Sequence, residues 1–242
     1  MVERFPSITL SGRTRGDRMI GKMLAAVIEN ALSADWGTVH TRLDTVLMLI
    51  ERTPDCTLPL IAQRLLVSGE DHRHARHPGF DLIAIGRACW RRLRYGTHEG
   101  ASTIEQQIVR VLTGRYERTV ARKLREIALA ALVSRRYAKH RLPAAYLWIG
   151  YYGWRMNGYV QACRRLGMVT QSLSSEEAAM LVARLKYPQP RDASVHRMTQ
   201  IERRAKHLRV LYQRHVIDGT YRHLNGPTLY KRSTSIEPLP QS

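Results

Sequence analysis

Cysteine and long apolar runs are both scarce in this chain of 242 residues. The three cysteines, Cys56, Cys89 and Cys163, lie far apart and form no C-x-x-C pair. Neither a zinc knuckle nor a disulfide scaffold is therefore indicated, and we expect buried free thiols. The most apolar stretch near the N-terminus is interrupted by Lys22 and Glu29, so we expect neither a signal peptide nor a transmembrane segment.

Acidic residues are few. The chain has 20 aspartates and glutamates against 39 lysines and arginines, which gives a formal net charge of +19. Such an excess favours an anionic partner, which could be a nucleic acid, an anionic membrane surface or a phosphorylated substrate. The alternative is a basic surface that only keeps the protein soluble. Because zinc-finger spacing and aromatic stacking motifs are missing, we do not expect nucleic acid as the partner.

Strand patterns are also few, and apolar residues recur mostly at helical spacing. The expected helices cover residues 17–34, 38–52, 59–76, 81–94, 100–114, 117–138, 143–152, 173–185 and 195–215. Two of them begin with a capping-box pattern, formed by Ser102 with Glu105 and by Ser174 with Glu177. Gly114 suits the end of the first of these. The sequence thus predicts a mainly α, single-domain protein.

The stretch GEDHRHARHPGFD, residues 69–81, concentrates carboxylates and histidines. In a continuous helix, Glu70, His74 and His77 would lie on one face, where a metal could bind. No H-E-x-x-H sequence and no second paired histidine–carboxylate motif supports that reading. We therefore favour an acid/base site in which the histidines form hydrogen bonds, and we predict no metal ligands among them.

A second stretch, residues 110–126, is strongly cationic. It contains Arg110, Arg115, Arg118, Arg122, Lys123 and Arg125, followed by Glu126. Guanidinium groups in such a cluster suit a phosphate or pyrophosphate, which they bind through paired hydrogen bonds. The competing interpretation is an Arg122–Glu126 ion pair, at i and i+4, on a merely basic helix face.

These motifs, in this order, resemble glycosyltransferase family 51, the peptidoglycan glycosyltransferase domain of class A penicillin-binding proteins and monofunctional transglycosylases. The first motif comprises Glu70, Asp71, His77, Gly79 and Asp81, with His74 in place of the family's aromatic residue. The second comprises Gly100, Ser102, Thr103, Ile104, Gln106, Gln107 and Arg110, with Glu105 in place of a threonine. The third is Arg122, Lys123 and Glu126, and a later one includes Glu177, Ala178, Ala179, Leu181, Pro188 and Pro190. The fourth retains Tyr146 and Leu147 but has Ala144 for a glutamate and Trp148 for an asparagine.

The resemblance implies polymerisation of lipid II, with inversion at the anomeric carbon and release of lipid pyrophosphate. Glu70 is then the catalytic base, and the apolar run before it suits a proton acceptor. Glu126, with a pKa lowered by its cationic neighbours, organises the cluster or binds a divalent metal, Mg or Mn, at the pyrophosphate. The substrate-binding residues implied are Asp71, Ser102, Gln107, Arg110, Arg118, Lys123 and Arg125. Ser102 could instead only cap its helix, and Gln107 could be merely exposed.

A lysozyme-like helical fold with a membrane-proximal region for substrate access is implied as well. We expect an N-terminal helical segment over 1–56, the glycosyltransferase domain over 57–215 and a tail over 216–242. Residues 81–94 form a basic amphipathic segment containing Trp90, which we expect at the bilayer interface.

The expected partners are lipid II, the growing glycan strand, an anionic membrane surface and other cell-wall synthesis proteins. The expected location is peripheral, on the periplasmic face of a bacterial inner membrane. Three alternatives stay open: a relative that binds lipid-linked glycan without polymerising it, a lytic enzyme, and a nucleic-acid-binding protein supported only by charge.

Overall fold

A computed structural model describes residues 23, 26–53, 58–96 and 100–224, and it confirms the mainly α fold class. Its helices are α2 (Ser33–Arg52), α3 (Leu60–Glu70), α4 (Leu82–Tyr95), α5 (Ile104–Thr113), α6 (Val120–Arg136), α7 (Leu142–Ile149), α8 (Tyr159–Leu166), α9 (Ser175–Lys186) and α10 (Val195–Ile217). Short 3-10 turns occur at η2 (His74–Arg76), η3 (Lys139–Arg141) and η4 (Arg222–Leu224). Strands β1 (Tyr151–Gly153) and β2 (Met156–Asn157) form one antiparallel hairpin.

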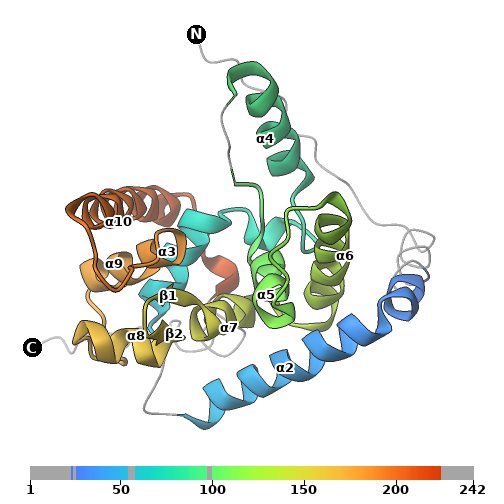
Figure 1. Cartoon of the computed structure of the whole chain (residues 1–242), viewed down its shortest axis with the longest axis horizontal. Coiled ribbons are helices and arrows are strands. Elements are labelled where there is room, and N and C mark those ends of the chain that lie inside the picture. The colour runs from blue at the N-terminus through green and yellow to red at the C-terminus, as the bar shows by residue number, and fades with distance from the viewer. Residues whose placement is uncertain (1–22, 24–25, 54–57, 97–99, 225–242) are drawn as a thin grey trace, which may run out of the picture.

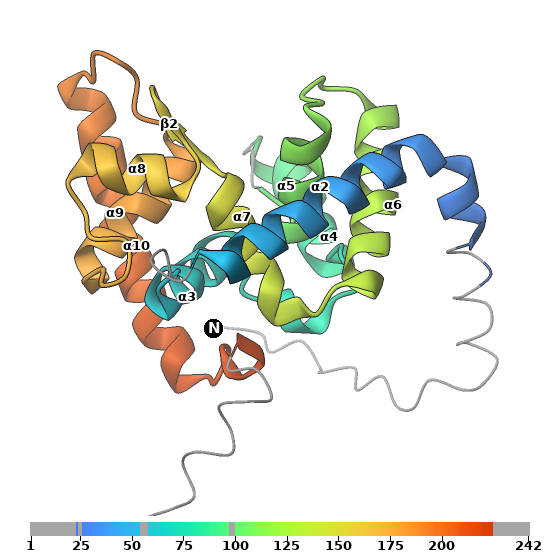
Figure 2. The same cartoon turned by 90° about the horizontal axis from the view of Figure 1, so that it is seen from below.

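The helices pack in two groups that share α7. Helices α3, α9 and α10 pack against one another, while α5 packs against α6 and α2 (Figure 1). Helix α7 contacts α2, α3 and α5, and it therefore joins the two groups (Figure 2). Its sequence LPAAYLWI is apolar on most sides, as expected for a helix covered from several directions.

Two caps were predicted correctly and one was not. Ser174 and Glu177 form the expected capping box at the start of α9, and Gly114 ends α5 with φ +67°. At the start of α5, however, the cap is Thr103, whose hydroxyl accepts from the Gln106 amide. The expected Ser102–Glu105 box is wrong, because Ser102 turns toward the cationic cluster and Glu105 is fully buried.

The predicted helix over 59–76 is interrupted. Helix α3 ends at Glu70, and Asp71 leaves the helical conformation with φ −159° and ψ 65°. Its side chain turns inward to accept from the backbone amide of Ile104, which a continuous helix would not allow. As a result, Glu70 does not share one helical face with the histidines that follow it.

Helix α4 was predicted over 81–94 and is found at Leu82–Tyr95, with Asp81 accepting from two backbone amides at its start. It projects from the body of the molecule (Figure 1), and none of its residues is buried. Leu82 is 69% exposed and Leu93 88% exposed, so its apolar side has no protein cover within the described structure. Cys89 is exposed as well, which contradicts the expectation of a buried thiol, whereas Cys163 is buried as predicted.

Some expectations fall outside the described residues: the first part of the helix over 17–34, Cys56, and the end of the tail beyond residue 224. The described part of the tail packs against the core through Tyr221 and Leu224. Within the described residues, no helix is both long and apolar enough to cross a bilayer.

Candidate functional site

Glu70 lies at the C-terminal end of α3, on the wall of a cleft of about 790 Å³. Leu65, Leu66 and Val67, the apolar run before it, are fully buried and anchor this end of the helix in the core. Glu70 itself keeps 18% of its side chain exposed, enough to meet a ligand. The local sequence therefore holds the carboxylate rigidly at the cleft surface.

Two side chains from other helices hold the Glu70 carboxylate. Gln107 on α5 donates to Oε2 at 3.1 Å, and Arg204 on α10 donates to Oε1 at 3.0 Å. Arg204 also donates to the carbonyl of Gly69 at 2.7 Å. Tyr146 lies near the same carboxylate, and burial together with that negative charge raises the pKa of its phenol. Gln107 is thus a partner of the predicted base and not a merely exposed residue.

Sequence reasoning missed Arg204. Residues 195–215 were identified only as a basic helix, yet Arg204 lies beside the buried positions Ile201, Ala205 and Leu208. Its position next to the apolar side of an amphipathic helix could have identified Arg204 from the sequence, because a buried guanidinium needs an acidic partner. Further cations border the cleft from two helices, namely Arg87 and Arg91 on α4 and Lys186 on α9.

Glu126 is the centre of the cationic cluster, and only 3% of its side chain is exposed. Arg110 donates two bonds to it, each 3.0 Å, from Nε and Nη2. Lys123 donates to Oε1 at 2.7 Å, and Arg122 also donates to Oε2. Burial alone would raise the pKa of Glu126, but the hydrogen bonds from Arg110 and Lys123 outweigh it, so the pKa is lowered. The expected Arg122–Glu126 pair is confirmed, and it lies inside a larger cluster. Binding of a phosphate by this cluster stays a prediction.

Ser102 connects the cluster to the cleft. Its hydroxyl lies on the cleft wall and bonds to Lys123 at 3.0 Å and to Arg110 at 3.3 Å. Arg110 is three residues beyond Gln107 on α5, so one helix holds the partner of Glu70 and the partner of Glu126. Glu70 borders the cleft and Glu126 a second pocket, and α5 together with Ser102 links the two.

Three of the predicted substrate-binding residues lie elsewhere. Arg118 is exposed in the segment between α5 and α6. Arg125 pairs with Asp35 of α2 at 3.5 Å and does not border the cleft, although it lines a second pocket with Arg110 and Glu126. Asp71 is buried and contacts His77 at 2.9 Å and the Ile104 amide at 3.1 Å. Although burial opposes ionisation, the neighbouring imidazoles of His74 and His77 lower the pKa of Asp71 strongly.

A divalent metal does not fit Glu126. Both of its oxygens already accept from cations, and three positive side chains surround it. A further dication would displace those bonds and add repulsion. Within the described residues, the group suited to a metal is a different one, formed by Asp71, His74, His77 and Glu105.

The fold and this site define a member of the transglycosylase family. The family model, described as Transglycosylase, matches residues 51–213, and the chain belongs to that family.

Among curated relatives, the chain is 29% identical to penicillin-binding protein 1B of Escherichia coli over 82% of this chain and 25% of that protein. It is 36% identical to penicillin-binding protein 1B of Vibrio cholerae over 53% of this chain and 17% of that protein. It is 31% identical to the biosynthetic peptidoglycan transglycosylase of Thiobacillus denitrificans, over 64% of this chain and 62% of that protein. The chain thus spans less than two thirds of each of these relatives.

Proposed function

We propose that this protein is a peptidoglycan glycosyltransferase that polymerises lipid II by inverting transfer, with release of lipid pyrophosphate. The observation that carries the proposal is the joined site: the Glu70 carboxylate faces the cleft, and the Glu126 cationic cluster begins at the same wall through Ser102. A lytic enzyme needs a carboxylate but no cluster for a leaving pyrophosphate. The curated relatives' names support the synthetic reading.

Glu70 is the proposed base. The 4-hydroxyl of the acceptor sugar attacks the anomeric carbon of the donor and transfers its proton to Glu70 as the new glycosidic bond forms. Gln107 and Arg204 fix the orientation of the carboxylate by holding one oxygen each. Arg204 thereby positions the base, a role that no expectation from the sequence assigned.

The leaving pyrophosphate departs with its bonding electron pair and needs charge stabilisation rather than a proton. Arg110 and Lys123 are the proposed contacts, because Glu126 holds both next to Ser102 at the cleft wall. Arg118, exposed between α5 and α6, is a proposed further contact for the lipid phosphate. We assign Asp71 a positioning role, and Arg125 a bridge to α2 through Asp35.

Peripheral attachment to an anionic membrane, on the periplasmic face of the inner membrane, completes the proposal. Helix α4 exposes Leu82, Trp90 and Leu93 together with its arginines, as expected for a helix at a bilayer interface. Its residues Arg87, Trp90 and Arg91 border the cleft that contains Glu70. A lipid-linked substrate could thus pass from the membrane to the base along this helix. The growing glycan strand and other cell-wall synthesis proteins are the remaining proposed partners.

A second function, binding of lipid-linked glycan without polymerisation, is favoured by the altered fourth motif. Ala144 and Trp148, which replace a glutamate and an asparagine, lie on α7 and are packed against the core. This helix also contains Tyr146, whose pKa is raised by burial and by the charge of Glu70. The glutamate and asparagine that Ala144 and Trp148 replace could contact substrate in the family. Their replacement removes those contacts but leaves the base and the cationic cluster intact.

Incubation with labelled lipid II, followed by gel electrophoresis, tests these alternatives. Polymer supports the proposal, shortening of preformed glycan supports a lytic enzyme, and binding with neither product supports the binder. Glu70→Gln should abolish polymer while lipid II affinity stays nearly unchanged, because only the transition state loses its base. Glu126→Gln should weaken both, because Arg110 and Lys123 lose their common partner. Polymerisation by Glu70→Gln at the wild-type rate would refute the mechanism.

A further inference from the structure

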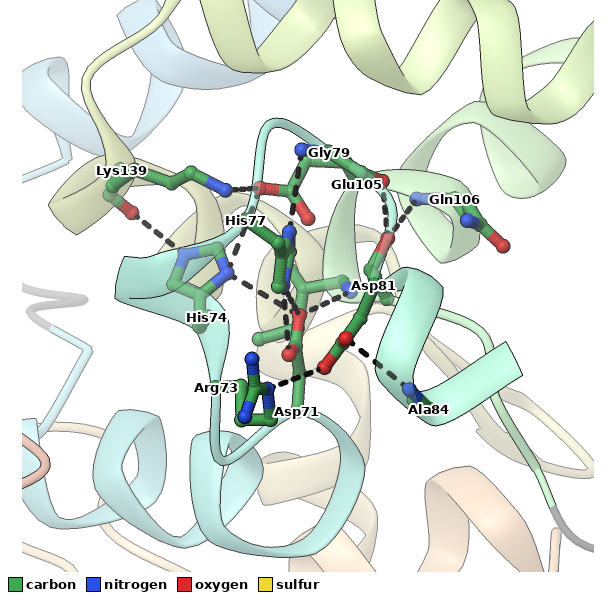
Figure 3. A network of polar contacts seen from close by, with 12 residues as sticks. Asp71, Arg73, His74, His77, Gly79, Asp81, Ala84, Glu105, Gln106 and Lys139 are labelled. Carbon is green, nitrogen blue, oxygen red and sulfur yellow. Dashed lines mark hydrogen bonds and ion pairs between the residues drawn. The ribbon is translucent and has the colours of Figure 1, made fainter. Parts of the chain in front are cut away.

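Four ionisable side chains meet in the core behind the cleft: Asp71, His74, His77 and Glu105. One ligand atom from each lies within 4.8 Å of the others, and all four residues are buried. Figure 3 shows the two histidines and the carboxylates directed toward one another, with Lys139 at the edge. None of the four borders the cleft that holds Glu70. The cluster thus lies outside the cleft, although Asp71 directly follows Glu70 in the chain.

Two atoms in this cluster have no hydrogen-bond partner among the described residues: Nδ1 of His74 and Oε2 of Glu105. Both residues are fully buried, and leaving a buried polar atom without a partner is destabilising. The Nε2 atom of His74 lies 3.0 Å from the carbonyl of Lys139, which can only accept. Nε2 is therefore the donor in this contact, and Nδ1 faces the cluster, an arrangement found in histidines that bind metals.

The spacing of the atoms matches a coordination sphere better than a set of hydrogen bonds. His74 Nδ1 is 3.4 Å from Asp71 Oδ2 and 3.6 Å from Glu105 Oε1. Ligands about 2.0–2.1 Å from a tetrahedral ion are separated by about 3.3–3.4 Å along each edge, which is close to these distances. A nitrogen and carboxylate oxygens at such separations can share one ion between them.

We infer that Asp71, His74 and Glu105 supply three of the four ligands of one bound zinc ion. Imidazole combined with carboxylates suits zinc, and the bound ion would take up the orphaned Nδ1 atom of His74. His77 orients Asp71, because its Nδ1 accepts from the Gly79 amide and its Nε2 proton is directed at that carboxylate. Lys139, which donates to Glu105, neutralises one of the two negative charges.

The site would join four segments of the chain: the end of α3, η2, the start of α5 and η3. His74 and Glu105 are also the two positions where the first and second motifs of this sequence differ from the family's pattern. In the structure His74 and Glu105 contact each other, and they supply one nitrogen and one oxygen ligand to the proposed site. The inference does not rest on the proposed function, since it needs no lipid-linked substrate.

Metal binding to the full-length, tag-free protein tests the inference. The protein is stripped with a chelator, loaded with zinc or cobalt, passed over a desalting column and analysed for metal content. We expect about one zinc per chain, cobalt absorption bands of a four-coordinate site, and a melting temperature raised by about 5–10 °C when zinc is at about 100 times its dissociation constant. If the wild-type protein retains no metal after it has been reloaded and desalted, the inference is overturned.

Variants separate this site from adventitious binding by other histidines. His74→Phe and Glu105→Gln should each lose the retained zinc and the melting shift, with helical content confirmed by circular dichroism. His196→Phe, at an exposed position of α10, is the matched control and should keep both. Zinc retained by both cluster variants, or lost from the control, would show surface binding and refute the site. Glu70→Gln should still bind zinc, so failure of the proposed chemistry would be visible separately.

Discussion

The most direct test of the cationic cluster is the loss of folding stability in Glu126→Gln. Removing one partner of a buried ion pair costs about 3–5 kcal/mol, because the other charge stays buried and unpaired. Here the partners are partly hydrated: the side chains of Arg110 and Lys123 are 30% and 33% exposed. Glutamine also keeps the shape and one acceptor. We therefore expect a loss of about 2–3 kcal/mol in the free energy of unfolding.

Urea unfolding followed by circular dichroism measures this loss. With a slope of about 2–3 kcal/mol per molar urea, the midpoint should fall by about 1 M. Glu202→Gln, at an exposed position of α10, removes the same charge and should change stability by less than about 0.5 kcal/mol. Added salt should narrow the difference between the two variants, because it screens repulsion among Arg110, Arg122 and Lys123. Equal stability of both variants would refute the role assigned to Glu126.

The pH dependence of the same variant follows from the lowered pKa of Glu126. A carboxyl group with a folded-state pKa below its unfolded value stabilises the protein above the unfolded value, and this contribution is lost as the pH falls through the folded one. The stability difference between wild type and Glu126→Gln should thus be largest at neutral pH and shrink below about pH 4.5. A difference that stays constant down to pH 3 would contradict the pKa shift.

Three further predictions concern other parts of the molecule. Gly79→Ala should destabilise by at least about 2 kcal/mol in urea unfolding, since φ is +97° and a Cβ would lie 2.2 Å from the Ala130 carbonyl oxygen. Gly86→Ala on α4, where a Cβ meets nothing within 4 Å, should instead be neutral or slightly stabilising. Leu93→Ser should weaken co-sedimentation of the protein with anionic vesicles. Raised salt should weaken co-sedimentation of the wild-type protein as well. If neither the substitution nor salt changes vesicle binding, α4 is not the membrane contact. Arg204→Ala should lower the polymerisation rate about 10- to 100-fold with little change in lipid II affinity, and an unchanged rate would remove it as a positioning residue.

The sequence by itself determined the features that depend on neighbours along the chain. Helical spacing located most helices, Ser174 and Glu177 set the cap of α9, and Gly114 ended α5. The bonds of Arg122 and Lys123 to Glu126 also follow from spacing, since residues three or four apart share one face of a helix. The position of Glu70 at the end of an apolar run was readable in the same way.

Tertiary structure decided every contact between distant segments. Arg204 meets Glu70 across 134 positions, and Arg110 meets Glu126 only because α5 packs against α6. Asp71 was expected in the cleft but turns into the core, where the Ile104 amide needs an acceptor. The sequence of α4 could not show that its apolar face stays exposed, because an amphipathic pattern predicts an apolar face but not what packs against it. Periodicity fixes which side chains share a face of one helix, whereas the partner of that face depends on how all the helices pack together.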